Sequence, residues 1–486
     1  MTSLVLLIAL IVLLPFALLC LHFLFGMRGS DFVFLAAVMF PAVWLSRLNL
    51  YTVAVGGVPY FSIWGVFAVM FLVFLPFGNA RTSRLLSISA RHTWVLLLAL
   101  VGVLGLSTLA NHESGRDIYR GLQASMFVLL PPLAAWAIVR ACHIDKDRVM
   151  RIVGALFFVG LFISMLSIMT ALAPGIFRQI VVTHKTMAET GRAFSPLGGP
   201  SATAMCLLPV YCLSGGQLLT GRRRLFALIV LACCFVALLT TLARAALVAF
   251  LVANIYLWVR YRHALARRIA TFVLIALVVL LPLAYAVGRV YTLERFTKGI
   301  MDDQRSTSLA VRSASLEAAV IYGAHHLFLG GGWGLVYPLQ RQGFVDPAEA
   351  TRIIYLQNLP SAPKPHNLFA LVFAEGGVIA LLLLMLLFWR IWRGLTPPDA
   401  GVSRDGHGVV HGFRAGYLSF LVMCVGQDHL FLANKISFFF YLFVFVGLAI
   451  SAYYQSETAA ASSVPVRPVP RSRSSWSATA AGARSI

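Results

Sequence analysis

Charged residues are scarce in this chain, and acidic residues are the scarcest of them. Asp, Glu, Lys and Arg together make up 12% of the 486 residues, whereas 60% are hydrophobic. A soluble protein of this length needs far more polar surface, so the composition predicts a polytopic membrane protein. The 17 acidic residues stand against 39 basic ones, which gives a net charge of +22. Such a charge often indicates nucleic-acid binding, but the basic residues here occupy short loops between apolar runs, so we interpret them as topology signals and expect no nucleic-acid partner.

Metal-binding and disulfide patterns are also missing. The seven cysteines show neither a metal-ligand spacing nor a disulfide framework. The acidic pair at 302–303 offers too few oxygen ligands for a metal ion, and the adjacent histidines at 325–326 point to different faces of a predicted helix. The glycine-rich run 330–334 lacks the Gly-Lys-Ser/Thr ending of a phosphate-binding loop, so we interpret it as a helix stop and a tight turn. The sequence therefore predicts no metal site and no cofactor.

Long apolar runs, in contrast, fill most of the chain. A helix needs about 20 apolar residues to cross a bilayer. Runs of that length, or close to it, lie at 3–26, 32–48, 61–78, 93–110, 121–140, 152–173, 200–215, 225–242, 245–261, 269–288, 366–389, 412–427 and 436–454. The first run lacks the basic region and the cleavage site of a signal peptide, so we count it as a span. The sequence predicts an all-α polytopic membrane protein with about 12–13 transmembrane helices.

Basic residues recur on every second connection between these runs, which predicts the orientation of the chain. Positively charged loops remain on the cytoplasmic side. The loops concerned carry Arg81, Arg84 and Arg91; Arg140, Lys146, Arg148 and Arg151; Arg222, Arg223 and Arg224; Arg260, Arg262, Arg267 and Arg268; and Arg390 and Arg393. The alternate loops then lie on the external side, with the N-terminus outside and the C-terminus inside.

One external loop, 289–365, is much longer than the others. Its interior has a helix-like pattern that stops at the glycine-rich run, and a Pro-rich return at 359–365 cannot be helical. Long ordered loops are often functional, so we expect a partly helical cap over the site. The predicted organisation is 1–31, an extra N-terminal transmembrane helix; 32–288, the first part of the transmembrane core; 289–365, the cap; 366–454, the last three core helices; and 455–486, a disordered cytoplasmic tail.

His366 stands where this loop meets an apolar helix. A histidine there can titrate near neutral pH while facing both water and a lipid-soluble substrate, so His366 is the first candidate for a catalytic base. The competing interpretation is an interfacial histidine that anchors a helix end. Asn367 and Glu375 could orient the base, and Glu375 could instead be a structural acid paired with an arginine.

Three arginines on the external side are candidates for anion binding. Arg244 lies between two apolar runs with almost no loop to solvate it, which is costly unless it meets an anion or reaches a headgroup. Arg192 occupies a Gly- and Pro-rich loop before a helix start, and Arg312 begins the helical part of the cap. Arginine binds phosphate bidentately, so the three together suggest a site that holds a diphosphate beside the base.

These motifs, taken in order, resemble the superfamily of O-antigen ligases and related polysaccharide polymerases, which are bacterial inner-membrane glycosyltransferases. Their signature is a His-Asn, His-Ser or His-Gln pair, then nine residues and a glycine, just after a large periplasmic loop. Here it reads His366-Asn367, residues 368–376 and Gly377. The turn that ends at Arg244 is similar to the family's Leu-Ser-Arg turn, and further similarities lie at Arg312, at His326 to Gly330, at Gly191-Arg192 and at Gly199-Pro200.

The resemblance implies a reaction. Such proteins transfer a glycan from undecaprenyl diphosphate at the periplasmic face to an acceptor hydroxyl, with inversion and without a metal or cofactor. By residue-to-residue correspondence, His366 would be the base, and Arg192, Arg244 and Arg312 would bind the diphosphate. The implied partners are the lipid-linked glycan, the lipid A core or another glycan acceptor, membrane lipids and other polysaccharide-assembly proteins.

Several functions stay open within and beyond this resemblance. A ligase is the leading hypothesis, with lipid A core as its acceptor, and a polymerase acting on a second lipid-linked glycan is the alternative. Three departures from the family pattern leave that choice open. Gly198-Gly199-Pro200 replaces the family's Asn-Pro-Asn, Ala243 replaces its serine, and the helix at 3–26 is extra. A protein O-oligosaccharyltransferase and a transporter of lipid-linked sugars are further alternatives. A transporter should carry ionisable residues along a midplane path, whereas these gather near one face.

Overall fold

The computed structural model of the chain describes residues 54–55, 58–59, 63–112, 115–172, 195, 199–220, 224–241, 243–261, 315–317, 319–333, 365–398, 404–427, 430 and 434–463. Its helices are α3 (Ile63–Phe74), the short 3-10 helix η2 (Leu75–Phe77), α4 (Ala80–Asn111), α5 (Gly115–Ala141), α6 (Lys146–Leu172), α9 (Pro200–Thr220), α10 (Arg224–Thr241), the helix Arg244–Tyr261, α15 (Leu368–Gly394), α16 (Arg404–Gly426) and α18 (Asn434–Ser463). Two short strands, β1 (Ala54–Val55) and β2 (Val58–Pro59), pair antiparallel.

The predicted all-α membrane fold is confirmed. In the part of the chain that the structure describes, nine helices are long and apolar enough to cross a membrane. The predicted spans at 3–26, 32–48 and 269–288 lie outside the described residues.

The structure differs from the sequence prediction around the loop expected at 79–92. There α4 begins at Ala80, capped by the Asn79 side chain, which accepts from Thr82 N at 3.2 Å. The helix has 32 residues, about 48 Å of length at 1.5 Å per residue, which exceeds the ~30 Å apolar layer of a bilayer. Its basic first turns extend beyond that layer, so the charges mark a protruding helix end. The preceding α3, with 12 residues, is too short to span alone.

The last helix also differs from its predicted extent. α18 runs through Ser463, past the boundary at residue 454 where a disordered tail was expected. Two hydrogen bonds hold this extension: Tyr453 Oη donates to Glu457 Oε1 at 2.7 Å, and Gln455 Nε2 donates to Thr396 O at 3.2 Å. Residues 464–486 lie outside the described part.

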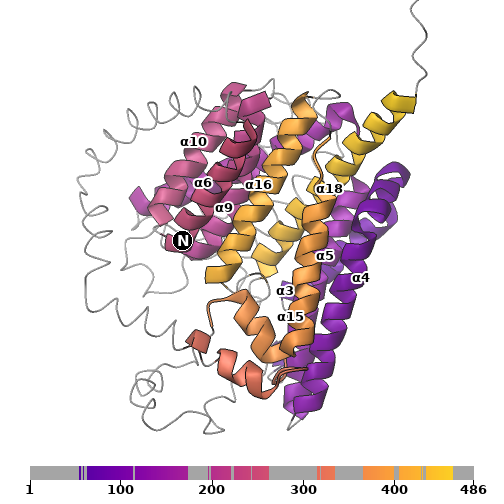
Figure 1. Ribbon diagram of the computed structural model, residues 1–486, viewed down its shortest axis with the longest axis vertical. Helices are drawn as coiled ribbons and strands as arrows, with labels where there is room; N and C mark the ends of the chain where they lie inside the picture. The colour runs from indigo at the N-terminus through magenta and orange to yellow at the C-terminus, as the bar shows by residue number, and fades with distance from the viewer. Residues whose placement is uncertain are drawn as a thin grey trace, which may run out of the picture.

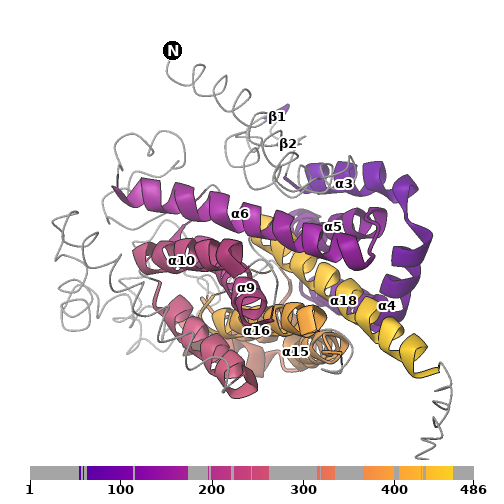
Figure 2. The ribbon, with the colours of Figure 1, turned by 90° about the horizontal axis from the view of Figure 1, so that it is seen from above.

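Two helices whose apolar spans are nearly fully buried, α9 and α18, organise the bundle (Figure 1). α9 packs against α16, α10 and α6, while α18 packs against α5 and α4. Seen from above (Figure 2), α6 lies across α9 and α10, and α18 runs between α5 and α16. The backbones of α9 and α16 come very close together at Gly412: a Cβ added there would lie only 2.8 Å from Leu213 Cα. Small residues give membrane helices this close packing where no hydrophobic driving force operates between them.

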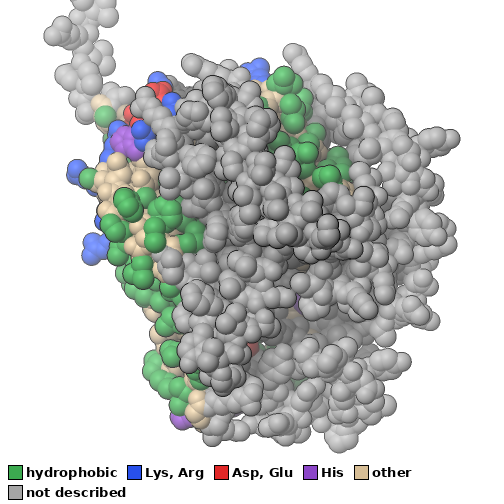
Figure 3. Space-filling model, turned by 180° about the vertical axis from the view of Figure 1, so that it is seen from behind, with side chains coloured by type: hydrophobic (Ala, Val, Ile, Leu, Met, Phe, Trp, Pro, Cys, Tyr) green, Lys and Arg blue, Asp and Glu red, His purple; other side chains and the backbone are tan. Residues whose placement is uncertain are grey.

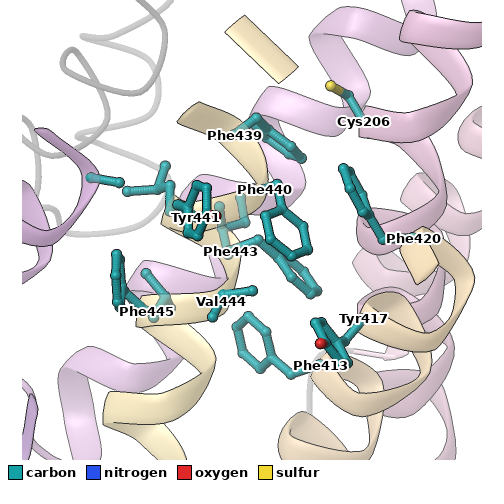
Figure 4. Packing of buried hydrophobic residues seen from close by; sticks show 14 of the residues in the cluster. Cys206, Phe413, Tyr417, Phe420, Phe439, Phe440, Tyr441, Phe443, Val444 and Phe445 are labelled. Carbon is teal, nitrogen blue, oxygen red and sulfur yellow. The ribbon is translucent and has the colours of Figure 1, made fainter. Parts of the chain in front are cut away.

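Aromatic rings fill the contact between α16 and α18 (Figure 4). The Phe420 and Phe440 ring centroids are 4.2 Å apart, and those of Phe413 and Phe443 are 4.6 Å apart. These side chains are fully or almost fully buried. The contact fixes α16 against α18 through dispersion, the attraction available inside a membrane.

The described basic side chains visible in Figure 3 gather in the upper half of the molecule. There the start of α4 meets the α5–α6 connection: Asn79 N donates to Arg140 O at 2.9 Å, and Ile144 N donates to Thr82 Oγ1 at 3.1 Å. We call this end of the bundle, Asn79–Arg84 with Arg140–Asp145, the basic end. The end of α4 and the start of α15 lie at the opposite end (Figure 1), which we call the His366 end.

Candidate functional site

The start of α15 fixes the position of His366. Asn367 is the N-cap of this helix: its Oδ1 accepts from Ala370 N at 3.0 Å, and its backbone is extended. Asparagine is among the preferred N-cap residues because its side chain satisfies an otherwise unpaired helical N–H. His366 is half-buried and directly precedes this cap, next to the buried Pro365. The imidazole is therefore anchored at a defined helix end, while Asn367 Nδ2 is still able to donate.

α15 is broken in its interior. Gly377 has φ 72° and ψ −172°, which divides the helix into a short first half and a longer second half. In a continuous helix Val378 N would donate to Ala374 O. Here Val378 N donates to Leu327 O at 2.8 Å, and Ala374 O accepts instead from Gly331 N at 2.9 Å. Residues Leu327 and Gly331 thus satisfy the backbone groups released by the break.

The end of α4 completes this arrangement with three polar side chains. Ser107 Oγ donates to Glu375 O at 2.5 Å and accepts from Gly332 N at 3.1 Å. Thr108 Oγ1 donates to Trp333 O at 3.1 Å, and Asn111 Nδ2 donates to Gly330 O at 3.0 Å. We call the ensemble the three-way junction, composed of Ser107, Thr108 and Asn111, the turn 327–333, and residues 374–378.

Two glycines make this contact sterically possible. Gly330 (φ 68°) and Gly377 (φ 72°) both adopt the left-handed region that other residues rarely occupy. A Cβ on Gly377 would lie 2.6 Å from Gly330 N and would collide with Phe328 O. The predicted helix stop and tight turn are present as far as Trp333, and they dock the turn 327–333 against α15.

Glu375 lies in the first half of α15, about two turns after the helix start at Leu368. It is 5% exposed, and its backbone carbonyl belongs to the three-way junction. The structure thus assigns a structural place to this residue's backbone. The two roles predicted for its carboxyl group, orienting the base or pairing with an arginine, stay predictions.

Arg244 is exposed and begins the helix Arg244–Tyr261. The preceding residue, Ala243, donates its backbone N–H to Thr241 Oγ1 at 3.4 Å. The far end of this helix lies beside the far end of α15, since the rings of Tyr256 and Trp392 are 5.9 Å apart. The two helices therefore run in the same direction, and Arg244 lies at the His366 end. Arg192 and Arg312 lie outside the described residues, so their approach to His366 stays a prediction.

Sequence reasoning missed Ser107, Thr108 and Asn111. Their only signal was a group of three polar residues at the end of a long apolar run, a pattern that also fits an ordinary helix end. Among the described residues, no three His, Cys, Asp or Glu side chains lie together as metal ligands.

Residues 229–385 match the family model for O-antigen ligase. This range starts in α10 and ends in α15, so it includes the Arg244 turn, the predicted cap, His366 and the glycine break. No curated protein matches the chain.

Proposed function

Because the chain belongs to the O-antigen ligase superfamily, we propose that it transfers a glycan from undecaprenyl diphosphate to a hydroxyl of the lipid A core. The reaction would take place at the periplasmic face of the bacterial inner membrane, where the predicted topology puts the His366 end. The family and the multi-pass architecture support a glycosyltransferase with lipid-linked substrates.

In this mechanism His366 removes the proton from the acceptor hydroxyl as its oxygen attacks the anomeric carbon. A new C–O bond forms on the face opposite the diphosphate, the bond from the anomeric carbon to the phosphate oxygen breaks, and the configuration inverts. Undecaprenyl diphosphate leaves with the bonding electrons. A correctly placed general base contributes about 10²–10⁴-fold to such a step.

The leaving diphosphate gains negative charge, and arginines are suited to stabilise it. Arg244, Arg192 and Arg312 are proposed to hold its oxygens through their planar donor forks. Their permanent charge would supply this stabilisation without a metal ion or a cofactor. Asn367 Nδ2 is proposed to donate to the substrate, and Glu375 to support the site from within α15.

The observation that carries this proposal is the placement of His366. It directly precedes a capped helix, and the three-way junction holds the other end of the same short helix. A base that must meet two large, mobile substrates benefits from such a fixed position, because orientation accounts for much of a barrier reduction.

The alternative is a polymerase that uses the same donor and transfers the glycan to a second lipid-linked glycan. The extra apolar run at 3–26 favours it. A protein O-oligosaccharyltransferase and a transporter of lipid-linked sugars are weaker candidates.

The test uses a strain that lacks the gene, complemented with wild type, His366→Ala or His112→Ala. His112 is an exposed histidine at the end of α4, at the same end of the bundle, and serves as the matched control. Lipopolysaccharide is resolved on a gel beside an assay of secreted polymer, and membrane levels of each variant are measured.

We expect wild type and His112→Ala to restore long glycan on the lipid A core, and His366→Ala to accumulate at normal levels without restoring it. Normal transfer by His366→Ala would remove the proposed base. Unchanged lipopolysaccharide with loss of secreted polymer would identify a polymerase instead.

A further inference from the structure

A second group of polar side chains lies between the end of the helix Arg244–Tyr261 and α16. Arg260 follows Arg244 by 16 residues, so about 24 Å of helix separates it from the His366 end. We call this group the Arg260–His411 cluster; its members are Tyr256, Arg260, Tyr261, Trp392, His407, His411 and Arg414. No step of the proposed glycan transfer uses it.

Hydrogen bonds connect the centre of this cluster in a defined order. Arg260 Nε donates to His411 Nε2 at 3.1 Å, and His411 Nδ1 lies 2.8 Å from Tyr256 Oη. Because the guanidinium can only donate, Nε2 must accept, and the imidazole is the neutral form with its proton on Nδ1. His411 then donates to Tyr256 Oη, which leaves the tyrosine O–H proton available for an acceptor.

Donors outnumber acceptors in this cluster. The guanidinium of Arg414 stacks 4.2 Å above the Trp392 ring, and its buried Nε has no hydrogen-bond partner within the described part of the chain. Arg260 is exposed, and its Nε donates to His411. Neither arginine forms an ion pair with a carboxylate among the described side chains. Arg414 also hydrogen-bonds to Tyr256, and both arginines act electrostatically on His411. Two cations in one cluster, with N–H groups beyond these bonds, favour the binding of an anion.

The surface that leads to Arg260 is apolar. Leu251, Ile255, Trp258 and Val259 are each more than half exposed on the same helix. In a membrane, side chains on the outside of a spanning helix contact acyl chains, and a tryptophan beside an arginine is typical of the interface region. An anion bound at Arg260 would have hydrocarbon next to it along the helix.

We propose that the Arg260–His411 cluster binds the phosphate of an anionic phospholipid headgroup in the leaflet opposite the proposed active site. Arg260, Arg414 and the Tyr256 hydroxyl donate to the phosphate oxygens, and an acyl chain lies along Leu251 and Ile255. Inorganic phosphate offers the same oxygens but gains nothing from the apolar surface, so acyl chains distinguish the two sources. The proposal does not depend on the transferase function.

The test measures lipid binding to the purified full-length protein in neutral detergent by native mass spectrometry. Phosphatidylglycerol, phosphatidylcholine and inorganic phosphate are titrated separately against wild type, Arg260→Gln and Arg414→Gln. Glutamine at 260 keeps a donor for His411 and removes the charge. Arg84→Gln is the matched control, because Arg84 is an exposed arginine at the basic end, on α4.

Each basic residue near a membrane surface contributes about 1 kcal/mol to anionic lipid binding, which corresponds to about a five-fold change in Kd. We expect the Kd for phosphatidylglycerol to rise about five-fold in Arg260→Gln and in Arg414→Gln, and to stay at the wild-type value in Arg84→Gln. Phosphatidylcholine should bind all four proteins equally weakly. Arg260→Lys, which keeps the charge without the fork, should lie between wild type and Arg260→Gln.

Thermal unfolding of each variant without lipid checks that it is folded, and Arg260 is exposed, so its replacement leaves the core untouched. Equal phosphatidylglycerol affinity in wild type and Arg260→Gln would overturn the proposal. It would also be overturned if phosphatidylcholine bound as tightly as phosphatidylglycerol, or if inorganic phosphate bound as tightly as the lipid.

Discussion

Replacing Gly377 with alanine tests whether the three-way junction holds α15 in its broken form. The residue has φ 72°, a conformation that costs a residue with a Cβ about 1–3 kcal/mol. The added methyl would also collide with Phe328 O and lie 2.6 Å from Gly330 N, and overpacking of this kind costs about 1–3 kcal/mol more. We therefore expect Gly377→Ala to lower the free energy of unfolding by about 2–6 kcal/mol.

The assay is SDS-induced unfolding of the purified protein in micelles, beside glycan transfer in the complemented strain. Gly105→Ala is the matched control: Gly105 lies inside α4, and a Cβ there would meet nothing within 4 Å. Alanine in a helix interior is about 0.5–1 kcal/mol more favourable than glycine, so the control should be neutral or slightly stabilised. If Gly377→Ala unfolded like wild type, the docking of the cap turn into α15 would be refuted.

Three further substitutions test the site and its support. Ser107→Ala should lower the free energy of unfolding by about 1–3 kcal/mol, because it removes two buried hydrogen bonds, although Gly332 N keeps its bond to Glu375 O. Ser87→Ala, whose exposed hydroxyl bonds only within α4, should change the free energy of unfolding little in the same SDS assay. Asn367→Ala should cost about 1 kcal/mol through loss of the N-cap. Asn367→Ser should restore that stability, because serine is also a good N-cap. Glycan transfer measured in both variants then separates the capping role from amide donation. If serine also restored transfer, the proposed donor role of Asn367 Nδ2 would be removed. Arg244→Lys should weaken transfer in the complemented strain although the charge is kept, because the bidentate fork is lost, and full activity would indicate simple charge balance.

Hydropathy predicted the spanning helices well because it depends on local composition. The run at 366–389 corresponds to α15, and that at 412–427 to most of α16. The error at α4 has a physical origin: a charged stretch indicates where a chain leaves the apolar layer, but arginine is also a good helix former. A helix that continues into water and a loop that begins there have the same hydropathy.

The three-way junction could not be predicted in this way, because its hydrogen bonds join residues far apart in the sequence. Ser107 and Glu375 are 268 positions apart, and Thr108 and Trp333 are 225 apart. No local pattern indicates which carbonyl a serine at a helix end will reach. The sequence predicted the glycine-rich turn, but not that this turn packs against the break in α15.

The spacing of the signature acquires a physical meaning from these contacts. Nine residues, 368–376, separate the N-cap Asn367 from the break at Gly377, which corresponds to about two and a half turns and 13 Å of helix. One end of this short helix is fixed by its cap, and the other by α4 and the cap turn. Its length sets the distance and the rotation of His366 relative to the junction, since each residue turns the helix by about 100°. The glycine and the histidine of the motif therefore depend on each other through geometry: the glycine allows the break that holds the helix, and the helix fixes the position of the histidine that precedes it.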